Sequence, residues 1–161
     1  MKRYITVFIL FIGILALNNC GFKPIYKLSD ESLTSTNYIV EFTNETSLKI
    51  RNKIEEIFQT KSSESFYKIY LNVRQSTVPL VINTNGTVDK YRVEIVLDFN
   101  VHEKSSNEKV YSNIVRGFAE YLVQNSEIET NKKFSQSIDI ATQKAVQMML
   151  TKIQSNILSS K

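Results

Sequence analysis

The sequence of 161 residues has little of what many functional sites need: one cysteine, one histidine, two prolines, four glycines and no tryptophan. A single cysteine cannot form an intramolecular disulfide, so burial alone must hold the fold together. Zinc normally needs three or four ligands, and neither Cys20 nor His102 has partners at ligand spacing. No arrangement resembles a nucleophile elbow. We therefore expect no metal site, no catalytic cofactor and no enzyme activity.

The first nineteen residues have the pattern of a secretory signal. Lys2 and Arg3 precede an uncharged stretch over residues 4–17 that is rich in Ile, Leu, Phe and Val. At about 1.5 Å of rise per residue this stretch would cover roughly 21 Å, whereas the hydrocarbon core of a bilayer is roughly 30 Å thick. The pattern predicts a cleaved signal peptide over residues 1–19.

Cys20 follows the apolar stretch at the distance that a lipoprotein signal peptidase requires. Its thiol would receive diacylglycerol, and its amino group would be acylated, for instance with palmitate, after cleavage. Leu17 fits the third position before the cysteine, whereas Asn19 departs from the usual Gly, Ala or Ser. Several acyl chains, each worth about 0.8 kcal/mol per buried methylene, hold a protein firmly on a membrane. We expect Cys20 to be lipidated; the alternative is an uncleaved anchor with an incidental cysteine.

The rest of the chain has the length of one domain and a mild charge. Removing Lys2 and Arg3 lowers the formal net charge from +4 to +2, and such a charge on an exported protein indicates no nucleic-acid partner. Residues 20–36 contain Pro24 and a polar run, which predict a lipidated tether. The folded domain is therefore expected over residues 37–161.

Alternating apolar and polar residues predict four strands, over residues 38–42, 67–74, 91–101 and 109–119. Residues 76–87, with Pro79 and Asn85-Gly86, are expected to form a long hairpin connection. Residues 104–108 are polar and predict a second hairpin turn. Gly117 is expected to mark a bulge or bend in the last strand.

Two segments have helical spacing instead. The first has apolar residues at Ile50, Ile54, Ile57 and Phe58, which predict a helix of about four turns with Asn44 as its cap. The second predicts a long surface helix with one buried stripe, because its lysines fall mostly on the opposite side. The stripe comprises Phe134, Ile138, Ala141, Ala145, Met149, Ile153 and Ile157, widened by Val146 and Leu150.

The order of these elements predicts the fold class. A strand, a helix and a second strand usually place the two strands parallel, and short connections make the following pairs antiparallel. We expect an α+β two-layer sandwich in which a mixed four-stranded sheet carries both helices on one face. The other face would then have no helical cover.

The start of the predicted mature chain resembles that of alphaproteobacterial LptE, a family of LPS-assembly lipoproteins. Here it reads Cys20-Gly21-Phe22-Lys23-Pro24-Ile25-Tyr26, and in that family it reads Cys-Gly-Phe-x-Pro-Leu-Tyr. The strand that begins at Asp89 and the helix over residues 135–158 lie where that family has equivalent elements. The resemblance implies a lipoprotein of the outer membrane that assembles with the LptD β-barrel, plugs its lumen and aids lipopolysaccharide transport to the outer leaflet. Gly21 also fits, since Asp at that position commonly retains lipoproteins in the inner membrane.

Two sets of residues are candidates for binding in this context. Lipid A carries phosphates, for which basic side chains are natural donors, and the candidates are Arg74, Lys90, Arg92 and Arg116. The alternative is that these are ordinary solvated strand residues. An apolar cluster in a predicted turn indicates a partner contact, unless it extends a strand into the core; it comprises Val78, Pro79, Leu80, Val81 and Ile82.

Two other functions stay open at this point. An auxiliary lipoprotein of an ABC-type lipid or solute transporter would also be a small α+β domain on a lipid anchor, and it would reside in the inner membrane. A lipid-anchored enzyme is the third possibility, with His102 as its best candidate residue.

Overall fold

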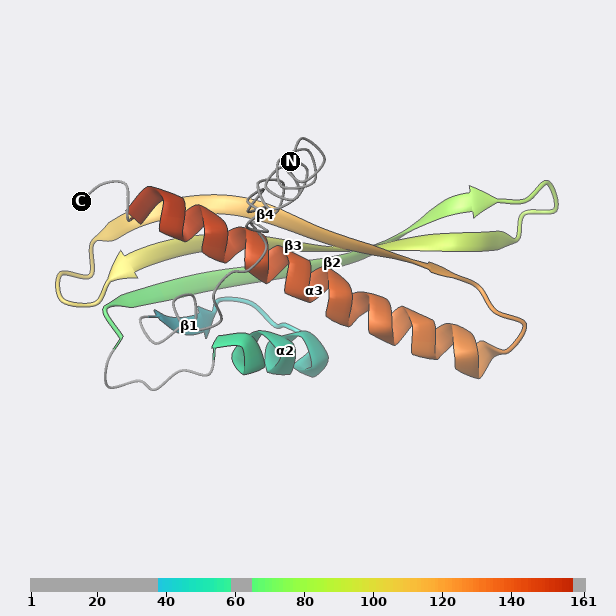
Figure 1. Ribbon diagram of the computed structural model, residues 1–161, viewed down its shortest axis with the longest axis horizontal. Helices are drawn as coiled ribbons and strands as arrows, with labels where there is room; N and C mark the ends of the chain where they lie inside the picture. The colour runs from blue at the N-terminus through green and yellow to red at the C-terminus, as the bar shows by residue number, and fades with distance from the viewer. Residues whose placement is uncertain (1–37, 59–64, 158–161) are drawn as a thin grey trace, which may run out of the picture. The chain divides into compact units, whose positions relative to one another are not determined.

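The computed structural model describes residues 38–58 and 65–157. The predicted signal peptide, Cys20 and the predicted tether over residues 20–36 lie outside these ranges. The elements follow the predicted order of strand, helix, three strands and helix (Figure 1). They are β1 (Tyr38–Phe42), α2 (Leu48–Phe58), β2 (Tyr67–Ile82), β3 (Val88–Glu103), β4 (Lys109–Leu122) and α3 (Glu127–Ile157).

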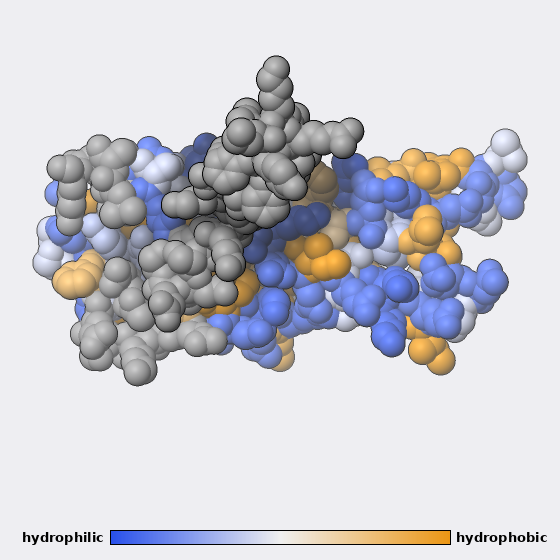
Figure 2. Space-filling view, in the orientation of Figure 1, coloured by the Kyte–Doolittle hydropathy of each residue, from blue (hydrophilic) through white to orange (hydrophobic). Residues whose placement is uncertain are grey.

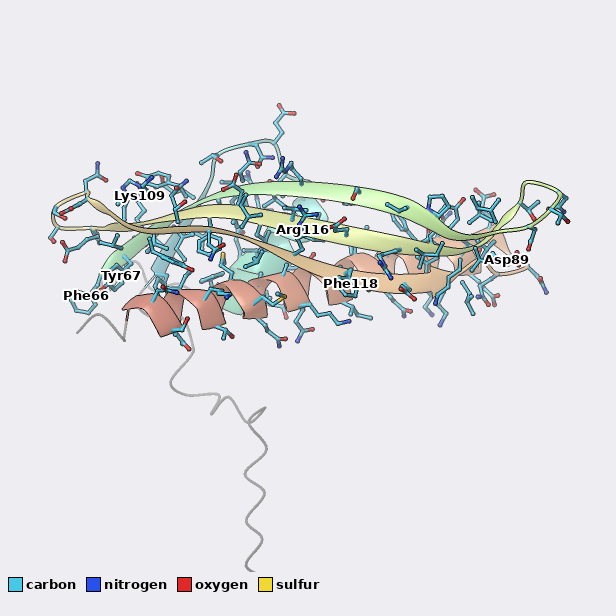
Figure 3. All side chains as sticks on the ribbon, turned by 90° about the horizontal axis from the view of Figure 1, so that it is seen from above. Phe66, Tyr67, Asp89, Lys109, Arg116 and Phe118 are labelled. Carbon is cyan, nitrogen blue, oxygen red and sulfur yellow. The ribbon has the colours of Figure 1, made fainter. Side chains whose placement is uncertain are left out.

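The strands form one mixed sheet in the order β1-β2-β3-β4. β1 runs parallel to β2, and the β2–β3 and β3–β4 pairs are antiparallel. Both helices contribute buried residues to the same core, and Figure 3 shows α3 lying along one side of the sheet. The predicted α+β sandwich is therefore confirmed, with one sheet face bearing the helices.

The core lies between this sheet face and the two helices. Alternate residues of the central strand β3, from Val93 to Val101, are fully buried, as period-two alternation requires. α2 contributes Ile50, Ile54 and Phe58. The predicted stripe of α3 is buried from Ile138 to Ile153, with Phe134 packed at its edge, while the side chain of Ile157 lies outside the described residues.

Gly117 lies where α3 crosses β4, and the bulge predicted there is wrong. The β3–β4 register passes through Ile95↔Gly117 without a shift. A Cβ atom at Gly117 would lie 2.1 Å from the carbonyl oxygen of Ala141 and 2.5 Å from the amide nitrogen of Ala145. Glycine is present here because the helix backbone approaches the strand more closely than any side chain allows.

Asn44 is not the cap of α2, which begins only at Leu48. Its side chain instead makes two hydrogen bonds to the backbone of Val73, in the place of a neighbouring strand. The Nδ2 group donates to the Val73 carbonyl at 2.7 Å, and the Val73 amide donates to Oδ1 at 3.0 Å. The late start also leaves α2 with 11 residues, about three turns rather than four.

β2 is longer than predicted, and the long connection expected over residues 76–87 is wrong. β2 pairs with β3 from Tyr67 to Ile82, and the turn between them occupies only residues 83–87. The β-branched residues of this segment, among them Thr77 and Val78, favour an extended backbone. Gly86 takes the positive φ of the turn, 84°, and its amide donates to the Asn83 carbonyl.

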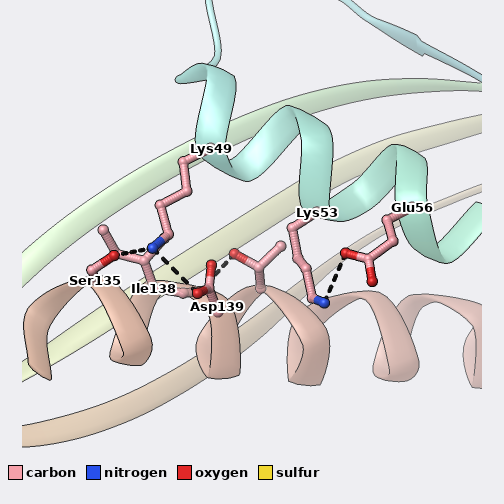
Figure 4. Close-up of polar contacts among 7 residues, drawn as sticks. Lys49, Lys53, Glu56, Ser135, Ile138 and Asp139 are labelled. Atoms are coloured by element: carbon pink, nitrogen blue, oxygen red, sulfur yellow. Dashed lines mark hydrogen bonds and ion pairs between the residues drawn. The ribbon is translucent and has the colours of Figure 1, made fainter. Parts of the chain in front are cut away.

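α2 and α3 are joined by polar contacts at their exposed margin (Figure 4). Lys49 Nζ lies 3.2 Å from a carboxylate oxygen of Asp139 and also donates to the hydroxyl of Ser135. Both charged side chains are partly exposed, so the pair is worth less than about 1 kcal/mol. The shared core, and not this pair, therefore holds the two helices together.

Candidate functional site

The sheet face opposite the helices, called here the open face, carries the predicted binding residues. Strand alternation places on it the residues that lie between the buried positions of β2, β3 and β4. Arg74, Val96 and Arg116 form one row across the three strands, and Asn72, Asp98 and Ile114 form the next. The open face therefore mixes charged, polar and apolar side chains.

Most charges of the open face are paired across neighbouring strands. Each pair joins a basic side chain to a carboxylate on an adjacent strand. Such a pairing cannot be inferred from the positions of the two residues in the sequence. The pairs are Lys68–Glu41 at 2.7 Å, Lys90–Glu120 at 2.5 Å, Arg92–Glu120 at 2.6 Å and Arg116–Glu94 at 3.1 Å. Three of the four predicted phosphate contacts thus already hold a carboxylate.

Arg74 is the exception among the four candidates. Its side chain is exposed on β2, and within residues 38–58 and 65–157 no carboxylate forms an ion pair with it. An unpaired guanidinium offers all its donors to an external carboxylate or phosphate. Of the predicted contacts, Arg74 is the one best prepared for an anionic ligand.

Glu120 lies between two cations, and the pKa of its carboxyl is lowered, first by the hydrogen bond from Lys90 and then by that from Arg92. We predict that Lys90→Met raises this pKa towards its ordinary value. A lowered pKa in the folded state stabilises the fold above the pKa of the unfolded chain, and that stability is lost as the pH falls through the folded value. The variant should therefore lose less stability on acidification.

A carboxyl NMR titration of Glu120 measures this change directly. Lys132→Met removes an exposed lysine from α3 and serves as the control, in which the pKa of Glu120 should not move. An unchanged pKa in Lys90→Met would contradict the predicted pairing.

β4 adds an apolar row to the open face that the sequence analysis missed. Val110, Ile114, Phe118 and Leu122 recur at every fourth residue, and each is about half exposed. The guanidinium of Arg92 lies 5.1 Å from the centre of the Phe118 ring, and the ammonium of Lys144 lies 5.8 Å from it. The signal was present in the sequence, because a four-residue period in a strand places all its members on one face.

The predicted partner segment, residues 78–82, lies on the distal part of β2 and not in a turn. It extends the strand, as the alternative held, yet it does not enter the core. All nine residues of β2 from Arg74 to Ile82 are exposed, and Ile82 reaches 62%. Figure 2 shows apolar surface gathered at this end of the β2–β3 hairpin.

A hollow of about 590 Å³ lies beside the distal end of β4 and the first half of α3. Lys90 and Lys133 bring positive charge to it, and Tyr121 and Ile140 bring apolar surface. Lys90 is already paired with Glu120, another lining residue. The hollow thus lies where the edge of the sheet at β4 meets α3.

His102, near the end of β3, has partners in the β3–β4 turn and on β2. Its Nδ1 atom lies 3.0 Å from the carbonyl oxygen of Asn107, and its ring meets that of Tyr70 edge-on at 5.0 Å. In the described parts of the chain, no three His, Cys, Asp or Glu side chains are grouped to hold a metal ion. No helix within those parts has the length and apolar character to cross a bilayer.

The fold is similar to that of several bacterial lipoproteins. Rare lipoprotein B from Shewanella oneidensis aligns with a TM-score of 0.51 at 11% identity, over 74% of this chain and 97% of that one. The minor lipoprotein from Acinetobacter baumannii gives 0.54 at 11% identity over 76% and 93%, and lipoprotein B from Nitrosomonas europaea gives 0.56 at 13% over 79% and 86%. No protein-family model and no curated protein matches the sequence. At such identities the likeness establishes a common fold.

Proposed function

We propose that the chain is an LptE-like lipoprotein of the outer membrane, anchored through an acylated Cys20. It assembles with an LptD-type β-barrel, plugs the lumen and aids the transport of lipopolysaccharide to the outer leaflet. The open face carries this proposal. Neither described helix covers it, the fold is shared with bacterial lipoproteins, and the first twenty residues have the pattern of a lipoprotein signal.

The polarity of the open face supports a place inside a barrel. The lumen of an outer-membrane barrel is generally polar, so a plug needs a surface that is neither strongly charged nor greasy. The open face meets this need because its cations are mostly paired with carboxylates and its apolar side chains on β4 alternate with polar ones. Arg74, with Lys90, Arg92 and Arg116 near the same surface, is the proposed contact for lipid A phosphates.

The proposal predicts that the full-length protein, tagged at its C-terminus, recovers a large β-barrel protein from detergent-solubilised outer membranes. Cys20→Ser removes the acylated atom, so the variant should lose the mass of the lipid and leave the outer-membrane fraction. Gradient fractionation measures the change of membrane fraction. Mass spectrometry measures the mass of the lipid and identifies the proteins that are recovered.

The matched control is Ser155→Ala, an exposed change on α3 that should alter neither result. Recovery of an inner-membrane permease in place of a barrel would reject the proposal and favour the transporter-associated lipoprotein.

A further inference from the structure

We propose that the outer edge of β2, from Gln75 to Pro79, pairs with an extended loop segment of the barrel partner, so that this segment continues the sheet beside β2. The segment must lie outside the closed barrel wall, because the strands of a closed barrel have no free edge. This inference rests on the proposed function and names the contact by which the partner is held. It concerns backbone pairing at the sheet edge, beside the side-chain contacts of the open face.

The first half of the β2 edge is already occupied. β1 pairs with β2 from Tyr67 to Leu71, and the Thr43 amide donates to the Leu71 carbonyl at 2.9 Å. The Asn44 side chain then takes both backbone groups of Val73. Among the described residues, coverage of this edge thus ends at Val73, where the Asn44 side chain makes the two backbone hydrogen bonds that a paired strand would make.

The edge beyond Val73 has backbone groups without such partners. The backbone amide and carbonyl groups of successive residues in a strand point to opposite edges. Those of Leu71 and Val73 point to the β1 side, so those of Gln75 and Thr77 point to the same side. Within the described ranges, only β3 pairs with this part of β2. Both faces of the segment are exposed as well. A row of unpaired amides and carbonyls is a template for strand addition, a common mode of peptide recognition.

Pro79 sets the far limit of this edge. It stands at the next outward position but has no amide to donate, and the register with β3 shifts between Pro79 and Val81. The free edge is therefore short, with outward amides only at Gln75 and Thr77. A short edge closed by proline admits one specific strand and discourages the unlimited pairing that leads to aggregation.

The side chains around the edge indicate what kind of strand fits. Arg74 has no ion pair in the described parts of the chain, and its five N–H donors can serve a carboxylate of that strand as well as a lipid phosphate. Val78 and Leu80, 44% and 37% exposed, favour apolar side chains on the same strand. β2 itself contains no acidic residue, so a second copy that paired through the same edge would bring no carboxylate from that strand to Arg74. A partner strand with an acidic and an apolar residue suits the edge better than self-pairing.

Thr77→Pro tests the edge with little effect on the fold. The substitution removes one outward amide and leaves every ladder bond with β3, and proline is tolerated at strand edges. Thr77→Val keeps the amide and is the matched control. We expect co-purification of the barrel with the full-length protein to fall about five- to tenfold for Thr77→Pro, the usual effect of losing one hydrogen bond, and to stay unchanged for Thr77→Val. Equal thermal unfolding of the two variants establishes that the fold is intact.

A second measurement uses a photo-cross-linking amino acid at Val78 or at Lys132 on α3. The inference expects cross-links to the barrel from position 78 and fewer from position 132. If the wild-type protein recovers the barrel but Thr77→Pro does so equally well and position 78 gives no cross-link, the edge inference is overturned and the proposed function stands. Cross-links from position 78 to a second copy of the chain also overturn it. If the wild-type protein recovers no barrel, the proposed function itself fails.

Discussion

Replacing Gly117 by alanine is expected to lower the free energy of unfolding by about 3 kcal/mol, the upper end of the usual cost of overpacking. The added Cβ would lie 2.1 Å from the Ala141 carbonyl oxygen and 2.5 Å from the Ala145 amide nitrogen. Both are backbone atoms of α3, so no rotamer change can remove the clash. The helix would have to move away from β4, and the buried contacts of Val115 and Ala119 with α3 would loosen with it.

Urea unfolding followed by circular dichroism measures this cost. The control is Gly86→Ala in the β2–β3 turn, where a Cβ would have nothing within 4 Å. That substitution should cost only about 1–2 kcal/mol, from the positive φ. Trimming Ala145 to glycine in the Gly117→Ala background should not restore stability, because the closest atoms belong to the backbone. Equal losses at the two glycines would refute the close approach of α3 to β4.

The sequence was sufficient for the elements whose periodicity is strong. β1 matches its prediction residue by residue, and the buried positions of β3 and α3 follow the predicted alternation and stripe. Parallel pairing of β1 with β2 also followed, since a helix connects them. These features depend on local patterns and chain connectivity, which a single sequence contains.

The features that were missed depend on contacts between distant parts of the chain. Asn44 has the residue type of a helix cap, and only its distance to Val73 reveals that it caps a strand edge. Gly117 looks like a bulge residue until α3 is seen to cross it. The predicted connection over residues 76–87 is wrong because Pro79, a frequent turn residue, lies here at an open edge of β2 where no ladder amide is needed.

The candidate site was predictable in composition but not in its pairing. Alternation placed Arg92 and Arg116 on one face, yet their carboxylate partners follow from the β3–β4 register, which sets Arg92 opposite Glu120. Cross-strand pairing turns four apparently similar cations into three paired groups and one available group, Arg74. The strand register, and not the sequence pattern, thus distinguishes Arg74 from the other three candidates.

Replacing Phe99 by alanine is expected to cost about 4 kcal/mol of unfolding free energy, as large-to-small changes of buried aromatic residues typically do. Phe99 is fully buried in the second half of β3, opposite Leu71, and its ring lies 5.9 Å from that of Tyr111. The strands and α3 are fixed by the rest of the core, so the space left by the ring cannot close fully. Phe99→Leu keeps most of the volume and should cost only about 1 kcal/mol.

Phe118→Ala is the matched control, because it makes the same substitution on the neighbouring strand but on the open face. Phe118 is 50% exposed, and its cation contacts with Arg92 and Lys144 lie at the surface. Its removal should therefore cost no more than about 1 kcal/mol. Urea midpoints at constant slope compare the three variants. If Phe118→Ala destabilised the isolated protein as much as Phe99→Ala, the open face would be part of the folding core and would not be free to meet a partner.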